Sequence, residues 1–298
     1  MLAKEILLEG RNQSLGEVSS LAFDADDHLY IVDKSKHRVL KRLGSSALLL
    51  VVGHINGSEG SNSLSLHSPN DIVLHGTSNL YVADTFNDRI QFYANGSREG
   101  VTLLLGTGSS AIKRPMSLAV DRRSSVLFIA DYGNDRIIRF DLTSKEWTIL
   151  IDRSTGLDRS SYLRNPISIQ FDERNGTLLV AQESSFNIVR CPVPFSRWTL
   201  VAGSAGSDLS GTSRTLFNQL CSFSLDSSGK VLVADCINER IQYFDDDLAK
   251  GRTVAGVIRA NGSNPYVFRR PTSIAFDSKD NLHVADSLNY RIQVFRKN

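Results

Sequence analysis

Positively charged and aromatic side chains occur in the short segments that separate the apolar runs of this chain. The positively charged or titratable candidates are Lys34, Lys36, His37, Arg114, Arg164, Arg269 and Arg270. The aromatic candidates are Phe86, Tyr132, Phe186 and Tyr290. Cations interleaved with rings bind single-stranded nucleic acid, whereas exposed rings also anchor protein partners. The acidic residues Glu183, Glu239 and Asp71 reduce the net positive charge of these segments. Three alternatives therefore remain open for the segments: solvated loops, a nucleic-acid surface, and a protein or glycan surface.

Histidine and aspartate side chains are the candidates for binding a metal ion. Of the six histidines, only His37, His54 and His67 fall in segments expected to converge, and we find no carboxylate directed at them. Asp71 stands where the other repeats have a serine, and this polar ring would hold water or a cation; its serines are Ser20, Ser117, Ser168, Ser222 and Ser273. No Ser-His-Asp set or pair of catalytic acids appears. We predict no catalytic residue, no cofactor and no enzyme activity; a metal-dependent lyase or hydrolase is the lesser alternative.

The composition and charge of the chain limit the possible classes of protein, but they do not identify a binding partner. The chain has 298 residues, 41% of them hydrophobic, and a formal net charge of +2. Any attraction to nucleic acid or membranes must therefore come from local clusters of charge. No apolar run is long enough to cross a membrane, so we expect no membrane insertion. The N-x-S/T acceptors at Asn12, Asn56, Asn95, Asn175 and Asn261 favour an exported protein, although Asn-Gly-Ser is also common in turns.

The candidate residues lie between copies of one recurring segment, KVLVADCINERIQYF at 230–244. Close copies are NLYVADTFNDRIQFY at 79–93 and NLHVADSLNYRIQVF at 281–295, and weaker copies begin at Leu29, Val126 and Thr177. The residues that end the apolar runs of successive copies are 47 to 53 positions apart. This period, with four short apolar runs in each copy and no helical periodicity, predicts an all-β repeat architecture.

The two ends of the chain predict how the repeats close. The sixth copy stops after its third apolar run, whereas KEILLEG at 4–10 resembles the fourth runs ALLLVVG at 47–53 and WTLVAG at 198–203. The N-terminal segment therefore supplies the last strand of the sixth sheet and covers an open edge. We predict a six-bladed β-propeller of four-stranded antiparallel blades. It is expected to be a single domain over 1–298, excised from a longer chain.

The repeats resemble the NHL-repeat family over essentially the whole chain. The resemblance is carried by the pattern V-A-D-x-x-N-x-R-I-Q, by VAG-x-x-G after Val201, and by Pro115, Pro166 and Pro271 before a first strand. The Gly-Gly pair of kelch repeats and the strand-ending Trp-Asp of WD40 repeats are missing. The resemblance implies a propeller but leaves function open. Members include RNA-binding regulators of translation and a peptide-amidating lyase whose zinc-binding histidines and channel calcium find no matching residues here.

A propeller would bring the candidate residues to one rim. The loops that lead from one blade to the next share this rim, which we call the top rim, with the turns between second and third strands. Blades six and one are neighbours, so Lys34, Lys36 and His37 would meet Arg269 and Arg270. We therefore predict a binding scaffold that presents its top rim to a protein or glycan, with single-stranded RNA as the alternative partner. The oligomeric state stays open.

Other recurring residues on this rim have structural interpretations. The Asp that ends the second strand and the Arg five residues later, such as Asp235 and Arg240, are expected to form an ion pair. In the fourth repeat Gln182 and Asn187 replace both members. Antiparallel pairing would also bring two cysteines of the fifth blade, Cys221 and Cys236, to the top of one sheet. They form either a disulfide or two buried thiols.

Overall fold

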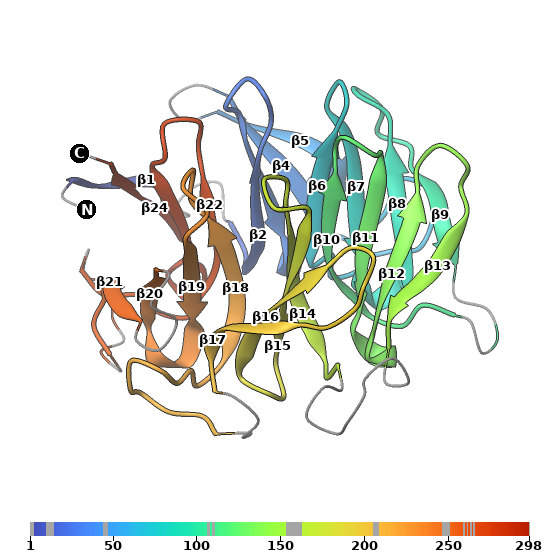
Figure 1. Ribbon diagram of the computed structural model, residues 1–298. Coiled ribbons are helices and arrows are strands. Elements are labelled where there is room, and N and C mark those ends of the chain that lie inside the picture. Colours follow the sequence, from blue (N-terminus) through green and yellow to red (C-terminus); the bar gives the residue numbers. More distant parts are fainter. Residues whose placement is uncertain are drawn as a thin grey trace.

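The structure, a computed structural model, is a ring of six four-stranded antiparallel sheets (Figure 1). It describes residues 3–9, 15–43, 47–105, 108, 111–152, 163–204, 209–245, 251–258, 260, 262, 264 and 266–297. The sheets radiate as blades from a central channel, so the predicted six-bladed β-propeller is confirmed. Within these residues no helix is long and apolar enough to cross a membrane.

Blades 1 to 3 each contain four consecutive strands. Blade 1 comprises β2 (Val18–Phe23), β3 (Leu29–Asp33), β4 (Arg38–Leu43) and β5 (Ala47–Gly53). Blade 2 comprises β6 (Asp71–His75), β7 (Asn79–Asp84), β8 (Arg89–Tyr93) and β9 (Val101–Leu105). Blade 3 comprises β10 (Pro115–Asp121), β11 (Val126–Asp131), β12 (Arg136–Asp141) and β13 (Trp147–Ile151).

Blades 4 and 5 follow the same order, and blade 6 is completed by the N-terminal strand. Blade 4 comprises β14 (Pro166–Asp172), β15 (Thr177–Gln182), β16 (Asn187–Pro192) and β17 (Thr199–Gly203). Blade 5 comprises β18 (Leu220–Leu225), β19 (Val231–Asp235), β20 (Arg240–Phe244) and β21 (Arg252–Gly256). Blade 6 comprises β22 (Pro271–Phe276), β23 (Leu282–Asp286), β24 (Arg291–Arg296) and β1 (Ala3–Glu9).

Ring closure joins the two ends of the chain. Strand β1 pairs antiparallel with β24, in the order β1-β24-β23-β22, and the two termini lie beside each other (Figure 1). This arrangement agrees with the sequence prediction that the N-terminal segment fills the last blade. Blade 6 therefore has four strands, and the outer edge of β24 is paired with β1.

The hydrophobic core is divided among the spaces between neighbouring blades. Val32 of blade 1 clusters with Val82 of blade 2, and Ile31 on the other face of blade 1 clusters with Ile292 of blade 6. Alternate residues of a strand point to opposite faces, so each blade packs against both neighbours. The contacts between neighbouring blades therefore continue around the whole ring, and they hold the loops of the top rim in fixed positions relative to one another.

Two local features shape the top rim. In five blades the first strand begins with a register shift next to its second residue, which is Ser19, Met116, Ile167, Cys221 or Thr272. In five blades a short 3₁₀ helix joins the second and third strands: η1 (Lys34–Lys36), η2 (Thr85–Asn87), η4 (Tyr132–Asn134), η6 (Cys236–Asn238) and η7 (Ser287–Asn289). Both features direct side chains toward the upper mouth of the channel.

Candidate functional site

The top rim is fixed to the blades by a buried ion pair in five of the six blades. Each joins the aspartate that ends the second strand to the arginine that begins the third: Asp33 with Arg38, Asp84 with Arg89, Asp131 with Arg136, Asp235 with Arg240, and Asp286 with Arg291. Their Nε to Oδ2 distances lie between 2.6 and 3.0 Å. In blade 4 the Gln182 amide donates to Asn187 at 3.0 Å instead. The predicted pairing is confirmed.

The same ion pairs also position the loops of the top rim. In blade 5, Arg240 Nη2 donates to the carbonyl oxygens of Ser213 and Leu216 at 2.8 and 2.9 Å. The backbone N–H of Asn218 donates to Asp235 Oδ1 at 2.9 Å. One buried pair therefore satisfies backbone groups of the loop that leads into its own blade, so the loop side chains have defined positions.

Two of the predicted arginines, Arg114 and Arg270, occupy equivalent positions directly before a first strand. Both have left-handed backbone conformations, with φ of 50° and 56°. Each backbone N–H donates at 2.6 Å to an acid of the preceding blade, Asp88 Oδ1 for Arg114 and Glu239 Oε2 for Arg270. These interblade hydrogen bonds hold a backbone conformation that arginine seldom adopts. Both residues are exposed on the top rim.

Lys34 is the third cation at the mouth of the channel. Its side chain is half-buried, and Nζ donates to Asn70 Oδ1 at 2.9 Å. Burial lowers the pKa of Lys34, and the nearby guanidinium groups of Arg270 and Arg114 also lower it. The carboxylate of Glu17 opposes this change. Arg114 directly precedes blade 3 and Arg270 directly precedes blade 6, so the charges that lower the pKa of Lys34 come from two other blades.

The aromatic candidates of blades 2 and 3 flank one of these cations. The Arg114 guanidinium lies 5.8 Å from the ring centre of Phe86 and 5.2 Å from that of Tyr132. The Tyr132 hydroxyl donates to Glu183 Oε2 at 2.7 Å, and Gln219 Nε2 donates to Glu183 Oε1 at 3.3 Å. Burial, together with the Glu183 hydrogen bond, raises the pKa of Tyr132 to about 12. These contacts link blades 3, 4 and 5 around the mouth.

The other predicted top-rim residues lie further from this cluster or serve the loops. Lys36 and Arg164 are half-buried, and the backbone N–H of Arg164 donates to Gln182 Oε1 at 2.9 Å. Arg269 is exposed, and its backbone N–H donates to Asp286 Oδ1 at 2.7 Å. Tyr290 is exposed and follows η7. Binding roles for these four residues remain predictions.

Two of the predicted histidines are joined by a carboxylate that sequence reasoning missed. His67 Nε2 lies 3.0 Å from Glu59 Oε2, and His37 Nε2 lies 3.4 Å from the same oxygen. His37 Nδ1 accepts the backbone N–H of Ser68 at 2.9 Å, so the neutral ring carries its proton on Nε2. Both nitrogens of His37 are therefore engaged. Glu59 lies in the loop between β5 and β6 that also contains His67, and no motif marks it.

The remaining metal candidates are separated from these histidines. His54 Nε2 bonds to Ser65 Oγ at 2.8 Å. In the described part of the chain, ligand atoms of three such residues come within 4.8 Å of one another only at Asp24, Asp26 and His28, in a turn on the opposite rim. Lys41 Nζ already pairs with Asp24 there, at 2.9 Å. The top rim therefore presents no assembled set of metal ligands among the residues described.

Asp71 joins three blades in the wall of the channel. Its Oδ1 accepts from Ser20 Oγ and the Ile72 N–H at 2.6 and 2.8 Å. Its Oδ2 accepts from Ser117 Oγ and the Leu118 N–H at 2.7 and 2.9 Å. Four donors saturate the carboxylate, so we assign Asp71 a structural role. The cavity of about 300 Å³ that it helps to line also includes all five serines of the ring.

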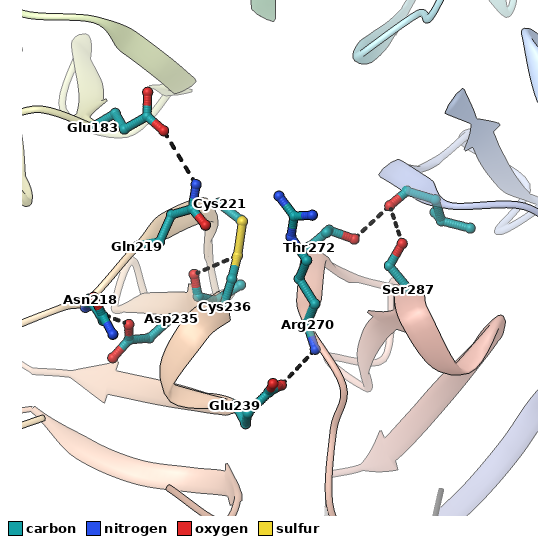
Figure 2. The surroundings of a disulfide bond; sticks show 12 residues. Glu183, Asn218, Gln219, Cys221, Asp235, Cys236, Glu239, Arg270, Thr272 and Ser287 are labelled. Atoms are coloured by element: carbon teal, nitrogen blue, oxygen red, sulfur yellow. Dashed lines mark hydrogen bonds between the residues drawn. A yellow bond between two sulfur atoms is a disulfide. The ribbon is translucent and has the colours of Figure 1, made fainter. Parts of the chain in front are cut away.

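A disulfide links the two cysteines of blade 5. Cys221, in the bulge of β18, is bonded to Cys236 of η6, with the Cα atoms 6.0 Å apart (Figure 2). Figure 2 also shows the Arg270 side chain extending past Thr272, away from Glu239. Cys191 is a buried free thiol whose pKa burial raises to about 12. The disulfide therefore joins the start of the first strand of blade 5 to the turn between its second and third strands.

Exposed apolar side chains are concentrated on the top rim. Among the described residues, nine of the thirteen exposed large apolar side chains lie there: Ile55, Leu64, Phe86, Leu209, Ile237, Val257, Ile258, Tyr266 and Tyr290. Leu49 and Ile149 lie within fourth strands, and Leu43 and Val101 stand at strand ends on the opposite rim. Sequence reasoning had identified only Phe86 and Tyr290. Isolated apolar residues between strands were the available signal for the other seven.

Comparison with models of protein families identifies the repeat that forms blade 6. A model of the NHL repeat matches residues 268–295, which span the loop into blade 6 and its strands β22 to β24. The chain contains an NHL repeat. The comparison with curated proteins found no significant match. The recognition made from the V-A-D-x-x-N-x-R-I-Q pattern is thus confirmed for an NHL-repeat propeller.

Solved structures with this propeller fold are distant in sequence. An auxiliary nutrient binding protein from Bacteroides thetaiotaomicron has 15% identity and a TM-score of 0.74, with 94% of this chain and 69% of that chain covered. One from Bacteroides ovatus has 14% identity, a TM-score of 0.70 and coverage of 98% and 72%. Virginiamycin B lyase from Staphylococcus aureus has 10% identity, a TM-score of 0.66 and coverage of 99% of both chains. At these identities the likeness concerns the fold.

Proposed function

We propose that this NHL propeller is a non-catalytic binding scaffold that presents its top rim to a protein or glycan partner. The asymmetry between the two rims carries the proposal. Nine exposed large apolar side chains occupy the top rim in the described residues, and two, Leu43 and Val101, stand at strand ends on the opposite rim. Apolar and aromatic side chains left in water on one face are typical of a surface that another molecule covers.

The charged groups nearest the channel support a binding role over a catalytic one. The Asp–Arg pairs and Asp71 are engaged in hydrogen bonds that hold loops and blades. Catalytic acids and bases need an accessible position beside a reacting group. The distant structural relatives include nutrient binding proteins and a lyase, so the fold alone does not choose between binding and catalysis.

The test compares substitutions of exposed apolar residues at the top rim with a substitution of one at the opposite rim. Ile237 is 50% exposed and Tyr290 is 48% exposed on the top rim, whereas Leu43 is 40% exposed at the opposite rim. We expect Ile237→Asp and Tyr290→Ala to weaken binding to the natural partner by about tenfold or more, as at an interface hot spot. Leu43→Asp is the matched control, with unchanged affinity. The partner is isolated with the wild-type protein, and its affinity for each variant is measured by calorimetry.

A result in which Leu43→Asp reduces the affinity and both top-rim variants bind normally would reject the proposed surface. A glycan array probed with the same variants separates the two partner classes. A saccharide bound through the rim loses its signal with Tyr290→Ala, because a sugar ring stacks on an aromatic side chain. A protein partner gives no array signal.

Single-stranded RNA is the second candidate, favoured by Arg114 between Phe86 and Tyr132 and by the adjacent Lys34. Rings beside cations stack bases and pair with phosphates. RNA binding predicts an affinity for oligouridylate that falls steeply with salt and depends on Lys34. An affinity that is weak and insensitive to Lys34→Gln excludes this candidate.

We also propose that the protein is exported. Of the acceptor asparagines, Asn56, Asn95 and Asn175 are exposed, and Asn175 Nδ2 also donates to Asp172 at 2.8 Å; Asn12 and Asn261 lie outside the described residues. The Cys221 to Cys236 disulfide also favours an oxidising compartment. Intact mass before and after enzymatic removal of N-glycans tests the proposal on protein from its natural source. A mass loss that maps to Asn95 supports export; an unmodified mass with reduced cysteines contradicts it.

A further inference from the structure

The interface between blades 6 and 1 has polar side chains at two positions where the other blades have aromatic or apolar ones. The first position lies three residues before the residue that ends the second strand. It holds His283 in blade 6, and the other five blades have buried residues there: Tyr30, Tyr81, Phe128, Leu179 and Leu232. The second position is the fifth residue of the third strand. It holds Arg42 in blade 1, and the other blades have Tyr93, Phe140, Cys191, Phe244 and Phe295, all buried.

Both polar side chains line one cavity on the rim opposite the top rim. The cavity has a volume of about 190 Å³. Blade 6 contributes His283, Asp277 and Arg296 to its wall, and blade 1 contributes Phe23, Leu29 and Arg42. At about 30 Å³ for each water molecule, this space equals about six waters or one small organic molecule. The two departures from the repeat therefore face a common space.

His283 brings a buried hydrogen-bond acceptor to this cavity. Its side chain is 8% exposed, and Nε2 lies 3.3 Å from Asp277 Oδ2. Asp277 is itself held in place, because its Oδ1 accepts the backbone N–H groups of Lys279 and Asn281 at 3.0 and 2.8 Å. The carboxylate fixes the ring proton on Nε2, which leaves Nδ1 as an acceptor. Nδ1 is buried, and no group among the described residues donates to it.

A buried acceptor without a donor is uncommon in folded proteins, because it loses its hydrogen bond to water and gains nothing in return. Burial also lowers the pKa of His283, although the hydrogen bond to Asp277 opposes this change, so protonation of Nδ1 does not remove the cost. A molecule in the cavity that donates an O–H or N–H group to Nδ1 would remove it. The ligand therefore needs a protic group.

The arginines of the wall specify a second group of the ligand. Arg42 is half-buried and Arg296 is exposed. A guanidinium group only donates hydrogen bonds, and its five N–H groups exceed what a single acceptor can use. Carboxylates match this planar set of donors, often through two parallel hydrogen bonds. The ligand therefore carries an acidic group as well as a protic one.

The remaining wall limits the charge and the polarity of the ligand. Asp27 and Asp277 also line the cavity, and their carboxylates repel a doubly charged anion more than a singly charged one. The ring centre of Phe23 lies 4.8 Å from that of His283, and buried Leu29 adds a second apolar surface. Apolar walls favour a ligand with carbon atoms over an inorganic anion.

We propose that this cavity between blades 6 and 1 binds a short hydroxy carboxylate. The carboxylate group lies against Arg42, and the hydroxyl donates to Nδ1 of His283. Polar residues in place of the repeat's apolar ones make the interface less stable than it could be, which is typical of a functional site. The cavity lies on the opposite rim, so this proposal is independent of the scaffold surface on the top rim.

Lactate is the probe, and propionate, which lacks the hydroxyl, and inorganic phosphate are compared with it at constant ionic strength. Each is titrated into protein with isotope-labelled histidine while the Nδ1 signal of His283 is followed by NMR. We expect lactate to shift this signal to saturation. Propionate should bind about tenfold more weakly, because it leaves the buried acceptor without a donor.

Two variants and a control locate the binding, with affinities measured by calorimetry. His283→Leu introduces the residue that blades 4 and 5 have at this position, so it should abolish lactate binding while the midpoint of urea unfolding stays equal or rises. Arg42→Gln should weaken binding about tenfold through loss of a charge-assisted hydrogen bond. The control is His75→Leu, because His75 also has a buried Nδ1 that no described residue contacts but lies outside the cavity wall. It should leave the affinity within about twofold.

A saturable shift with lactate that is lost in His283→Leu and kept in His75→Leu supports the site. The absence of a saturable shift with lactate overturns the proposal and leaves the cavity to water. Propionate binding as tightly as lactate, or phosphate binding more tightly, overturns the choice of a hydroxy carboxylate. These measurements involve no residue of the top rim, so their failure is distinct from failure of the scaffold proposal, which the rim variants Ile237→Asp and Tyr290→Ala decide.

Discussion

The buried pair of blade 5 permits a quantitative prediction about the rim. Arg240 is 1% exposed, Asp235 is 0% exposed, and Nε lies 2.8 Å from Oδ2. In Arg240→Ala the Asp235 carboxylate stays buried without its counter-charge, which costs about 3–5 kcal/mol. The loop carbonyls of Ser213 and Leu216 also lose a donor, but water reaches a rim loop, so we add little for them. The expected loss is a large share of the roughly 5–15 kcal/mol that stabilises a typical domain.

Blade 4 supplies the compensating change. Gln182 and Asn187 occupy the same two positions and bond to each other at 3.0 Å. We therefore expect the double variant Asp235→Gln with Arg240→Asn to lose about 2 kcal/mol less than the two single variants together. The neutral pair leaves no buried charge without a partner.

The assay is urea unfolding followed by circular dichroism and tryptophan fluorescence, with the m-value compared among variants. Lys279→Ala is the control, because Lys279 is exposed in a turn of blade 6; it is expected to change the unfolding free energy by about 0.5 kcal/mol or less. Hydrogen exchange of the loop at 209–219 should rise in Arg240→Ala. Additive losses, within about 0.5 kcal/mol, would refute the coupling and the account of the rim that depends on it.

Three further predictions concern groups around the channel mouth. Burial lowers the pKa of His37 below its ordinary 6.5, so in acid the unfolded state binds the extra proton first; stability to urea should fall between about pH 7.5 and pH 5.5. The fall should be smaller in His37→Asn, whose side-chain oxygen can still accept the Ser68 N–H. Tyr132 should ionise near pH 12 in an ultraviolet titration, and Glu183→Gln should lower its pKa because a neighbouring negative charge is removed. The disulfide closes a separation of 15 residues, so Cys236→Ser, or reduction of the wild-type protein, should cost about 3 kcal/mol in unfolding free energy. A reduced protein as stable as the oxidised one would contradict this last prediction.

Sequence reasoning succeeded where a repeated local pattern reports a repeated local structure. The Asp and Arg of each copy are five residues apart across a turn, so their pairing depends on one hairpin, and the joint change to Gln182 and Asn187 exposed it. The N-terminal strand was predictable for the same reason, because its apolar run matches the fourth run of other copies. Glu59 was missed because it contacts His67 of its own long loop and His37 of the turn after η1, and no repeat encodes either contact.

The candidate site shows the limit of the same reasoning. A grouping of Lys34 with Arg269 and Arg270 follows from the order of the blades, since blades 1 and 6 are neighbours. The structure adds Arg114 of blade 3, whose charge lowers the pKa of Lys34 although blades 1 and 3 are not neighbours. It also turns the Arg270 side chain away from Glu239, which accepts only the Arg270 backbone N–H (Figure 2).

The sequence alone determined the number of blades, the strands in each, the closing strand and the residues that link a turn to its loop. The blades, their strands and the links from turn to loop depend on contacts within about fifty residues, which recur six times and so reinforce one another. The closing strand pairs with β24 across almost the whole chain, and it was recognised because its apolar run repeats that of other fourth strands. Only the tertiary structure decided which loops converge at the channel and which apolar side chains remain exposed. Those outcomes depend on the closed ring, in which Ser20 of blade 1 and Ser117 of blade 3 both donate to Asp71 although about two repeats of the chain separate them.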